Sequence, residues 1–355
     1  MKASKFSAGD WVEVLRKEEI LRTLDKKGQL DGMPFMPEML AFCGKQFKVF
    51  KRAHKTCDTV FPIRGRRVSH AVHLDTRCDG SGHDGCQQAC LLFWKDEWLK
   101  PVKRSASGEF VQISAAPSIA GAALTNAGCT EADLAAATVA SVAPNGEITY
   151  ACQATLLPQY TTELNWWNFS QYVEDFTSGN TSLWRIFSGA VYSIYYSISH
   201  AGIGLGKPME WFYDTFHPLW GGTKFPRKTG RIPEGQPTPT GILNLEPGEL
   251  VRVKSHDEIL NTLNPLNMNR GLYFDAEEVP YCGKTYRVLS RVTNIIDEKT
   301  GKMMKMGSPC IILDNVVCES RYSECRMFCP RAIYTWWREN WLERVEPDNS
   351  TVRNG

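Results

Sequence analysis

Apolar and polar residues alternate at the start of the chain in the manner of a short strand. Residues 11–14 follow a glycine turn and place Val12 and Val14 on one face of a half-buried strand. Residues 18–24 then carry Ile and Leu at helical spacing, and a passage rich in Gly and Pro leads to a second strand near residues 47–50. The pattern therefore predicts a strand, a short helix and a second strand.

The same pattern returns near the other end of the chain, because the sequence contains an internal repeat. The segment GDWVEV at residues 9–14 recurs as GELVRV at residues 248–253, and the triplet CGK at Cys43 recurs at Cys282. Gly9 and Cys43, like Gly248 and Cys282, are 34 positions apart, so the copies align without a gap. We interpret them as two homologous modules.

Each module combines the opening G-D/E-x-V-x-V with a distant x-V-x-x-R strand, at Val49 in the first copy and at Val288 in the second. This combination resembles the SH3-like small β-barrels. The resemblance implies a barrel in the first two-thirds of each module, capped by a cysteine-rich loop and by an aromatic segment at residues 93–99 or 336–342. The expected fold class is α+β, with two SH3-like modules separated by a mainly helical insert.

Helical patterns dominate that insert. A capping-box sequence at Thr130 opens a helix predicted to reach about residue 141, and a turn at residues 144–146 leads to a strand over residues 147–153. The predicted organisation is a four-cysteine module over residues 1–104, a helical domain over 105–220, a linker over 221–247, a second four-cysteine module over 248–346 and a tail over 347–355.

An amphipathic helix is predicted within the insert, because Phe169, Tyr172, Val173 and Phe176 recur at helical spacing. Further helices are expected over residues 182–200 and from Pro208, the latter carrying Trp211, Phe212 and Phe216. We expect the aromatic side chains of these helices to lie in the core.

Four cysteines occupy matching positions in each copy. They are Cys43, Cys78, Cys86 and Cys90 in the first module, and Cys282, Cys318, Cys325 and Cys329 in the second. Four thiolates complete a tetrahedral zinc site with no open position, so the sequence predicts two structural zinc sites. The spacing lacks C-x-x-C knuckles, which leaves iron–sulfur clusters as an alternative and buried thiols or disulfides as a third interpretation.

The remaining cysteines and the histidines carry a weaker signal. Cys57, Cys129, Cys152 and Cys310 have no counterpart in the other copy, and we expect ordinary buried thiols there. His83, between Cys78 and Cys86, is the one histidine whose position suggests that it replaces a sulfur ligand.

Charge is balanced over the whole chain but not locally. The net charge is +2, whereas eight basic residues and one acidic residue fall within residues 44–67. Such a face is usually solvated, but it is also suited to the phosphates of a nucleic acid. The candidate contacts are Lys51, Arg52, Arg64, Arg66 and Arg67.

Several function classes find no support in the sequence. We find no phosphate-binding loop, dinucleotide fingerprint, serine-hydrolase elbow or zinc-protease motif, and we assign no catalytic residue. The N-terminus lacks the apolar stretch of a signal peptide, so a cytoplasmic location is expected. The uncharged run between Arg185 and Lys207 contains serines, glycines and a histidine, which favours a buried or interfacial helix over a membrane span.

These observations favour a metal-stabilised binding or scaffold protein with a protein partner and no membrane partner. An iron–sulfur protein for electron transfer or redox sensing is the first alternative. A nucleic-acid-binding protein that uses the basic part of the first module is the second.

Overall fold

The computed structural model describes residues 4–61, 64–104, 110–112, 128–202, 204–323 and 325–345. The chain divides into two compact units, which are described separately. The first comprises Met1–Ile186, Asn294–Lys305 and Glu324–Ala332, and the second comprises Phe187–Thr293, Met306–Ser323 and Ile333–Gly355. Helices and antiparallel sheets occur together, which confirms the α+β class. The predicted tail lies outside the described residues, and the other predicted boundaries stay predictions.

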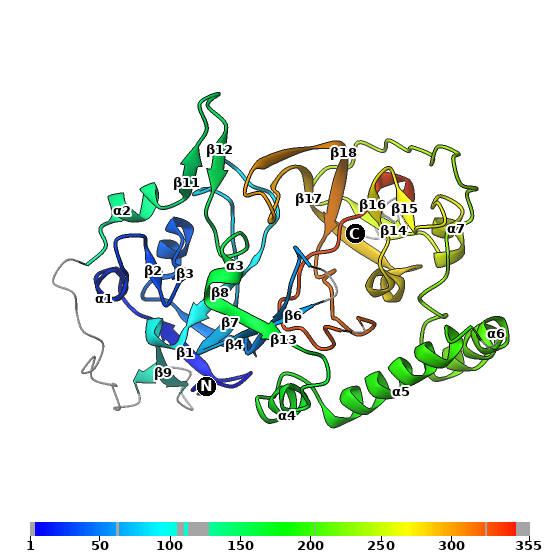
Figure 1. Ribbon diagram of the computed structural model, residues 1–355, viewed down its shortest axis with the longest axis horizontal. Helices are drawn as coiled ribbons and strands as arrows, with labels where there is room; N and C mark the ends of the chain where they lie inside the picture. Colours follow the sequence, from blue (N-terminus) through cyan, green and yellow to red (C-terminus); the bar gives the residue numbers. More distant parts are fainter. Residues whose placement is uncertain are drawn as a thin grey trace, which may run out of the picture. The chain divides into compact units, whose positions relative to one another are not determined.

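An antiparallel sheet organises the first unit (Figure 1). Its strand order is β10 (Phe110–Gln112), β9 (Leu99–Arg104), β1 (Trp11–Val14), β4 (Gln46–Arg52), β7 (Ala71–Arg77) and β8 (Leu91–Lys95). Strand β1 is central because it pairs with β4 on one side and with β9 on the other. Its predicted alternation is confirmed, since Val12 and Val14 are buried while Trp11 and Glu13 are partly exposed.

The described strands do not form the closed barrel that the SH3-like resemblance implied. A barrel closes when its outermost strands pair with each other. In the first unit the outermost strands are β10 and β8, and within the described residues they do not pair. In the second unit the described strands form an open sheet of order β18-β17-β14-β19.

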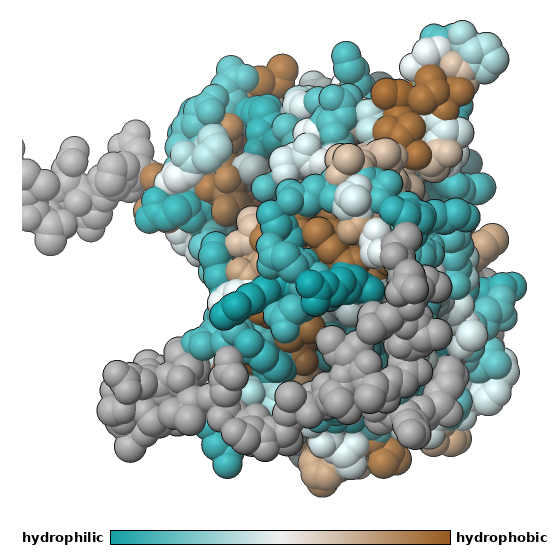
Figure 2. Space-filling view, turned by 90° about the vertical axis from the view of Figure 1, so that its left-hand side faces the viewer, coloured by the Kyte–Doolittle hydropathy of each residue, from teal (hydrophilic) through white to brown (hydrophobic). Residues whose placement is uncertain are grey.

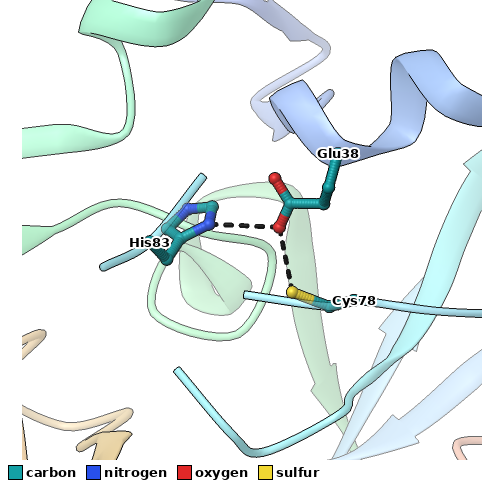
Figure 3. A group of neighbouring side chains, drawn as sticks. All are labelled: Glu38, Cys78 and His83. Carbon is teal, nitrogen blue, oxygen red and sulfur yellow. Dashed lines mark hydrogen bonds and ion pairs between the residues drawn. The ribbon is translucent and has the colours of Figure 1, made fainter. Parts of the chain in front are cut away.

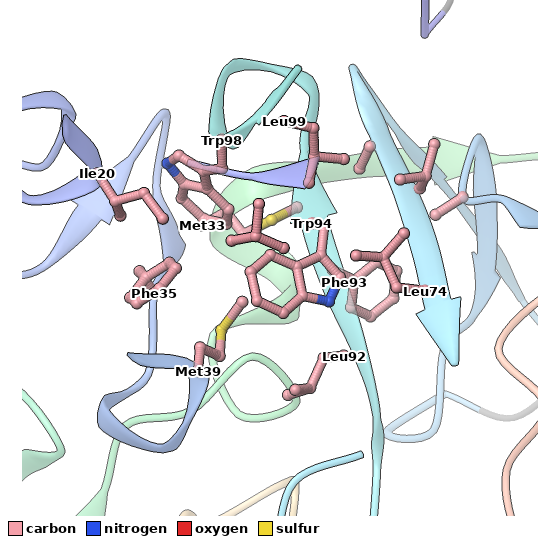
Figure 4. Packing of buried hydrophobic residues seen from close by; sticks show 14 of the residues in the cluster. Ile20, Met33, Phe35, Met39, Leu74, Leu92, Phe93, Trp94, Trp98 and Leu99 are labelled. Carbon is pink, nitrogen blue, oxygen red and sulfur yellow. The ribbon is translucent and has the colours of Figure 1, made fainter. Parts of the chain in front are cut away.

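Two tryptophans fill the centre of the first unit (Figure 4). Trp94 and Trp98 are fully buried, and Phe35 lies edge-on to them at ring-centroid distances of 6.0 and 5.1 Å. Trp98 Nε1 donates a hydrogen bond to Thr23 Oγ1 at 3.1 Å, so the buried indole N–H is satisfied.

The second unit repeats this packing. Trp341 takes the place of Trp98, and its Nε1 donates to Thr262 Oγ1 at 2.8 Å. Phe274 lies edge-on to Trp337 and Trp341 at 6.2 and 5.3 Å. The repeat in the sequence therefore corresponds to a repeated core, in which the same aromatic contacts and the same indole hydrogen bond occur twice.

The smaller elements also correspond in pairs. Helix α1 (Lys17–Thr23) matches α7 (His256–Leu260), and strands β2 (Gln29–Leu30) and β3 (Met33–Pro34) match β15 (Met268–Asn269) and β16 (Leu272–Tyr273). The 3₁₀ helices η1 (Pro37–Phe42) and η2 (Asp96–Trp98) match η4 (Ala276–Tyr281) and η5 (Glu339–Trp341). Among the strands, β1, β4, β7 and β9 match β14 (Leu250–Val253), β17 (Thr285–Ile296), β18 (Met303–Leu313) and β19 (Leu342–Arg344).

The insert forms the predicted helices and strand together with further elements, and residues 139–141, expected at the end of the first helix, lie in a strand instead. Helix α2 (Glu131–Ala136) has the expected cap, since Thr130 Oγ1 accepts a hydrogen bond from the Asp133 N–H, and it ends earlier than predicted. The elements that follow are the hairpin β11 (Val139–Val142) and β12 (Ile148–Tyr150), then α3 (Leu157–Tyr160), β13 (Thr161–Leu164), α4 (Ser170–Thr177), α5 (Leu183–Ser199), α6 (Gly206–Phe216) and η3 (His217–Trp220).

Side chains on the face shown in Figure 2, on the side of α1 and α2, are mostly hydrophilic. Hydrophobic side chains gather below the tip of the β11–β12 hairpin at the upper right of that view, where Val139 and Val142 are exposed. Within the described residues, no helix combines the length and the apolar character that crossing a membrane requires.

A second, three-stranded sheet in the first unit carries a buried ion pair. Its order is β13, β6 (Gly65–Val68) and β5 (Lys55–Cys57). Lys55 Nζ donates to Asp175 Oδ2 of α4 at 2.6 Å and to the Met327 carbonyl at 2.7 Å. The ammonium group thereby ties β5 to α4 and to the C-terminal segment 325–332, which belongs to this unit.

The expectation that the aromatic stripe of α4 lies in the core is wrong. Phe169 and Val173 are 71% and 62% exposed, and Asp175 on the opposite face is fully buried. The polar face turns inward because Asp175 is needed as the partner of Lys55. Helix α6 shows the same correction, since Trp211 and Phe212 are exposed.

We expect the repeated indoles to dominate stability. Trp98→Ala and Trp341→Ala should each lower the free energy of unfolding of their own unit by about 3–5 kcal/mol, because each removes a buried side chain and leaves a cavity. Urea denaturation followed by circular dichroism measures this loss. The matched control is Trp211→Ala, whose side chain is 65% exposed and whose loss should cost about 0.5 kcal/mol or less. Equal losses at Trp98 and Trp211 would contradict the packing described above.

Candidate metal centre

A small cavity in the first unit is lined by cysteines. Its volume is about 30 Å³, which is room for a water molecule or a single ion. Cys78, Cys86, Cys90 and Cys152 all line it, together with His83. The loop between β7 and β8 supplies all of these residues except Cys152, which follows β12.

Glu38, Cys78 and His83 form a cluster of ligand-type side chains next to this cavity (Figure 3). The Cys78 thiol donates to Glu38 Oε1 at 2.9 Å, and His83 Nδ1 lies 3.1 Å from the same oxygen. One ligand atom from each residue lies within 4.8 Å of the other two, and in the described part of the chain no other group of three or more Cys, His, Asp or Glu side chains meets this criterion.

Local backbone features bring the three side chains together. Glu38 lies in the first turn of η1, and its carboxylate is within reach of the loop because position 82 is a glycine. A Cβ atom at Gly82 would lie only 2.5 Å from Glu38 Oε2. Gly80 has a positive φ of 74°, and a Cβ there would collide with the Cys86 backbone, so the turn requires glycine for both reasons.

The His83 ring is held from both sides. Its Nε2 lies 3.0 Å from the Ala151 carbonyl oxygen, an arrangement in which the Nε2–H donates. Metal-bound imidazoles are commonly oriented by a hydrogen bond of this kind from the ring nitrogen that does not bind the metal. Nδ1 therefore faces Glu38 and Cys78. Burial lowers the pKa of the ring, but the hydrogen bond and charge of Glu38 raise it overall, so a metal ion bound here would displace the Nδ1 proton.

The electrostatics of the cluster leave one polar atom without a partner. Burial opposes ionisation of Glu38, but the hydrogen bonds and charge of His83 and the Cys78 thiol hold the pKa of the carboxyl below its usual range. Burial and the Glu38 carboxylate raise the pKa of the Cys78 thiol. Glu38 Oε2 is buried and accepts no hydrogen bond, which is costly for a carboxylate oxygen. A cation at this point would relieve that cost.

The first predicted cysteine set is brought together only in part. Cys78, Cys86 and Cys90 line one cavity. Cys43 is outside the Glu38 cluster and outside the cavity lining, and its charged neighbours are Glu18 and Lys17, at the start of α1. Burial and Glu18 raise the pKa of Cys43 to about 11.

Two residues of this site had little signal in the sequence. Cys152 lies outside both repeats, so a comparison of the two copies could not select it. In the sequence, Glu38 is notable only because it matches Glu277 in the second copy. One carboxylate that the two copies have in common does not by itself indicate a metal ligand. His83 was singled out by its place between two cysteines, and the structure places it beside Glu38 and Cys78.

The second predicted set is distributed over the two compact units. Cys282 and Cys318 belong to the second unit, whereas Cys325 and Cys329 belong to the first. A four-cysteine zinc site at these residues therefore stays a prediction.

The carboxylate that matches Glu38 has different partners. Glu277 Oε1 accepts a hydrogen bond from the Tyr322 N–H and lies 3.5 Å from Ser323 Oγ. The second module has no histidine at the place of His83. Without an imidazole beside it, burial dominates and raises the pKa of Glu277 to about 7.

Comparison with known proteins does not assign the chain to a family. No protein-family model matches it, and no curated protein is detectably similar to it in sequence.

Most of the candidate nucleic-acid contacts are engaged in ion pairs. Arg64 pairs with Glu163 at 2.6 Å, Arg66 with Asp58 at 3.1 Å, and Arg67 with Glu174 at 2.8 Å. Arg52 lies 4.0 Å from Glu174 and donates to the Phe6 carbonyl, and Lys51 lies over the Phe50 ring. These pairs link β4 and β6 to α4 and β13, and nucleic-acid binding stays an untested prediction.

The titration of Glu277 gives a pH dependence with a definite sign. Its pKa rises from an ordinary value of 4.5 to about 7 in the folded chain, so the folded state holds the proton more tightly. The stabilising contribution is complete below pH 4.5 and is lost as the pH rises through 7, with a total of about 3 kcal/mol. Urea denaturation of the second unit at several pH values measures this slope.

Two variants distinguish the contribution of Glu277 to this pH dependence from that of the other carboxyl groups in the second unit. Glu277→Gln cannot ionise and should remove the contribution of this carboxyl to the slope between pH 4.5 and 7, a window in which the shifted pKa values of Glu278 and His256 also contribute. Glu246→Gln changes an exposed carboxyl of the same unit and should leave the slope as it is. An unchanged slope in Glu277→Gln would show that another group is responsible.

Proposed function

We propose that this chain is a metal-binding protein whose first unit holds a structural zinc ion at Glu38, Cys78 and His83. The observation that carries the proposal is the cluster itself, in which a carboxylate oxygen, a thiol sulfur and an imidazole nitrogen lie within 4.8 Å of one another, with Glu38 and His83 buried and Cys78 partly buried. These are the ligand atoms that zinc takes in proteins. The buried, unpartnered Glu38 Oε2 is a second and independent feature that a cation would satisfy.

A fourth ligand is available from the cavity. Cys86, Cys90 and Cys152 line it together with Cys78 and His83. None of these three thiols lies within 4.8 Å of all the ligand atoms of the cluster, so one of them would have to move toward it to complete a tetrahedral set. A closed four-ligand site stabilises a fold and leaves no position for a substrate. Here it would hold η1, the loop between β7 and β8, and the segment after β12 together.

We further propose that the two modules are related to SH3-like domains, although their described strands form open sheets, and that they act as a binding or scaffold protein with cytoplasmic thiols kept reduced. Both copies have the same strand pairing. In the first copy β1 pairs with β9 and with β4, and in the second copy β14 pairs with β19 and with β17. The exposed apolar residues of α4 and α6 support a protein partner, because large exposed apolar surfaces usually mark interaction sites.

An iron–sulfur cluster is the second candidate, and one observation favours it. Cys78, Cys86, Cys90 and Cys152 line a single cavity, and four cysteine thiolates are the usual ligand set of such clusters. A cluster is larger than a single ion, so the cavity of about 30 Å³ would have to widen to hold one. This candidate uses Cys152, whereas the zinc cluster at Glu38 does not require it.

Metal analysis of the anaerobically purified chain tests the zinc site. We expect bound zinc in the colourless protein, and Cys78→Ser and His83→Gln should each lose one equivalent relative to the parent, because each removes one ligand. Cys43→Ser and Cys129→Ser are matched controls that should keep the full metal content. Full zinc retention in Cys78→Ser and His83→Gln would exclude the site, and loss in Cys43→Ser would favour the four-cysteine arrangement instead.

Absorption spectroscopy tests the iron–sulfur candidate on the same samples. A brown protein with absorbance near about 400 nm, bleached by a reductant, would identify a cluster. In that case Cys152→Ser should abolish the colour, because it removes one of the four thiolates around the cavity, and Glu38→Gln should preserve it. A colourless parent protein that contains zinc, and that keeps its zinc in Cys152→Ser, would reject this candidate.

A further inference from the structure

The C-terminal segment 325–332 is bound to the first unit by several buried contacts. The Met327 carbonyl accepts a hydrogen bond from Lys55, the Ala332 carbonyl accepts one from Arg77 at 2.9 Å, and Arg331 forms an ion pair with Glu298 at 3.0 Å. In Figure 1 this segment is the orange loop next to β6. These contacts place Cys329 directly against strand β5.

Two thiols meet at this junction. The Cys57 backbone N–H donates to Cys329 Sγ at 3.1 Å, and Cys329 lies close enough to raise the pKa of the Cys57 thiol. Both residues are buried, at 7% and 3% exposure. They are 272 positions apart in the sequence, so this contact exists only because the chain folds back on itself.

The surroundings of the pair are unsuited to a metal ion. Arg331 Nη1 lies 4.0 Å from Cys57 Sγ, and the charge of the Lys55 ammonium interacts with Cys329. Two cationic side chains repel a metal cation and stabilise a thiolate. Among the described residues, no third Cys, His, Asp or Glu joins these thiols in a ligand group.

We propose that Cys57 and Cys329 are a redox-active thiol pair that forms a reversible disulfide between β5 and the C-terminal segment. This inference is separate from the zinc site, because neither residue belongs to the Glu38 cluster or lines the cavity. It assigns a role to Cys57, and it gives Cys329 a role other than metal binding.

The chemistry requires a disulfide-containing oxidant, such as oxidised glutathione. One protein thiol loses its proton, and the thiolate attacks a sulfur of the oxidant to give a mixed disulfide and one released thiolate. The second protein thiolate then attacks the mixed disulfide and releases the other. In total two protein thiols are oxidised, one external disulfide is reduced to two thiols, and both protons end on the released thiolates.

Oxidation is expected to be slow but stabilising. The neighbouring thiol and burial together raise the pKa of Cys57 well above its usual range, so the thiolate is scarce and the exchange waits for local opening of the segment. Once formed, the bond closes a very long loop and restricts the unfolded chain, which raises the unfolding temperature of the first unit.

Peptide mapping of the full chain tests the proposal. The protein is equilibrated with a series of reduced and oxidised glutathione mixtures, quenched in acid, alkylated and digested without reductant. We expect a peptide pair that joins Cys57 to Cys329, appears with increasing oxidant and is lost after reduction. The oxidised protein should also unfold at a higher temperature than the reduced protein.

Variants provide the controls, and the wild-type map stands even if a variant fails to fold. Cys57→Ser and Cys329→Ser should lose the linked peptide and the oxidant-dependent rise in unfolding temperature. Cys129→Ser should keep both. The proposal would be overturned if Cys57 and Cys329 stayed reduced, and were therefore alkylated, at every oxidant ratio. It would also be overturned if they formed disulfides with other cysteines instead of with each other.

Discussion

A buried ammonium group determines much of the first unit. Lys55 is almost fully enclosed, and a charge in such a place is tolerated only when it is completely paired and hydrogen bonded. Its partners are Asp175 of α4, Gln171 of the same helix and the Met327 carbonyl. This requirement turns the polar face of α4 inward and holds segment 325–332 against β5. The junction of Cys57 with Cys329 and the position of Arg331 follow from it.

The two copies of the repeat show how one backbone arrangement can support different chemistry. Glu38 and Glu277 occupy matching positions on η1 and η4, and both are buried. In the first copy a histidine and a thiol surround the carboxylate, and its pKa falls. In the second copy backbone N–H groups and a serine surround it, and its pKa rises. The different loop residues around the two carboxyl groups thus shift their pKa values in opposite directions.

Local sequence patterns predicted several of the helices and strands and the repetition of the module. The strand at residues 11–14, the cap at Thr130, and helices α4 and α5 all follow from periodicity and capping, which act over a few residues. Periodicity predicted an apolar stripe on α4 but could not tell which face would be buried, because that depends on a lysine 120 residues away. Whether a barrel closes likewise depends on pairing between distant strands.

The candidate site shows the same division. The loop cysteines and His83 lie close together in the sequence, so their spacing was informative. Cys152 enters the cavity from beyond β12, and Cys329 reaches Cys57 from the other end of the chain. No local pattern encodes such contacts, since they depend on how whole elements pack.

The first unit is built from three separate segments of the chain, and this has a consequence for its folding during synthesis. Residues 294–305 and 324–332 complete a unit that otherwise ends at Ile186. Domains often fold while the ribosome is still translating the chain, starting from the N-terminal end. Here the nascent N-terminal part cannot bury Lys55 in its final environment until Met327 has left the exit tunnel, so the first unit cannot complete its fold when its own N-terminal part emerges.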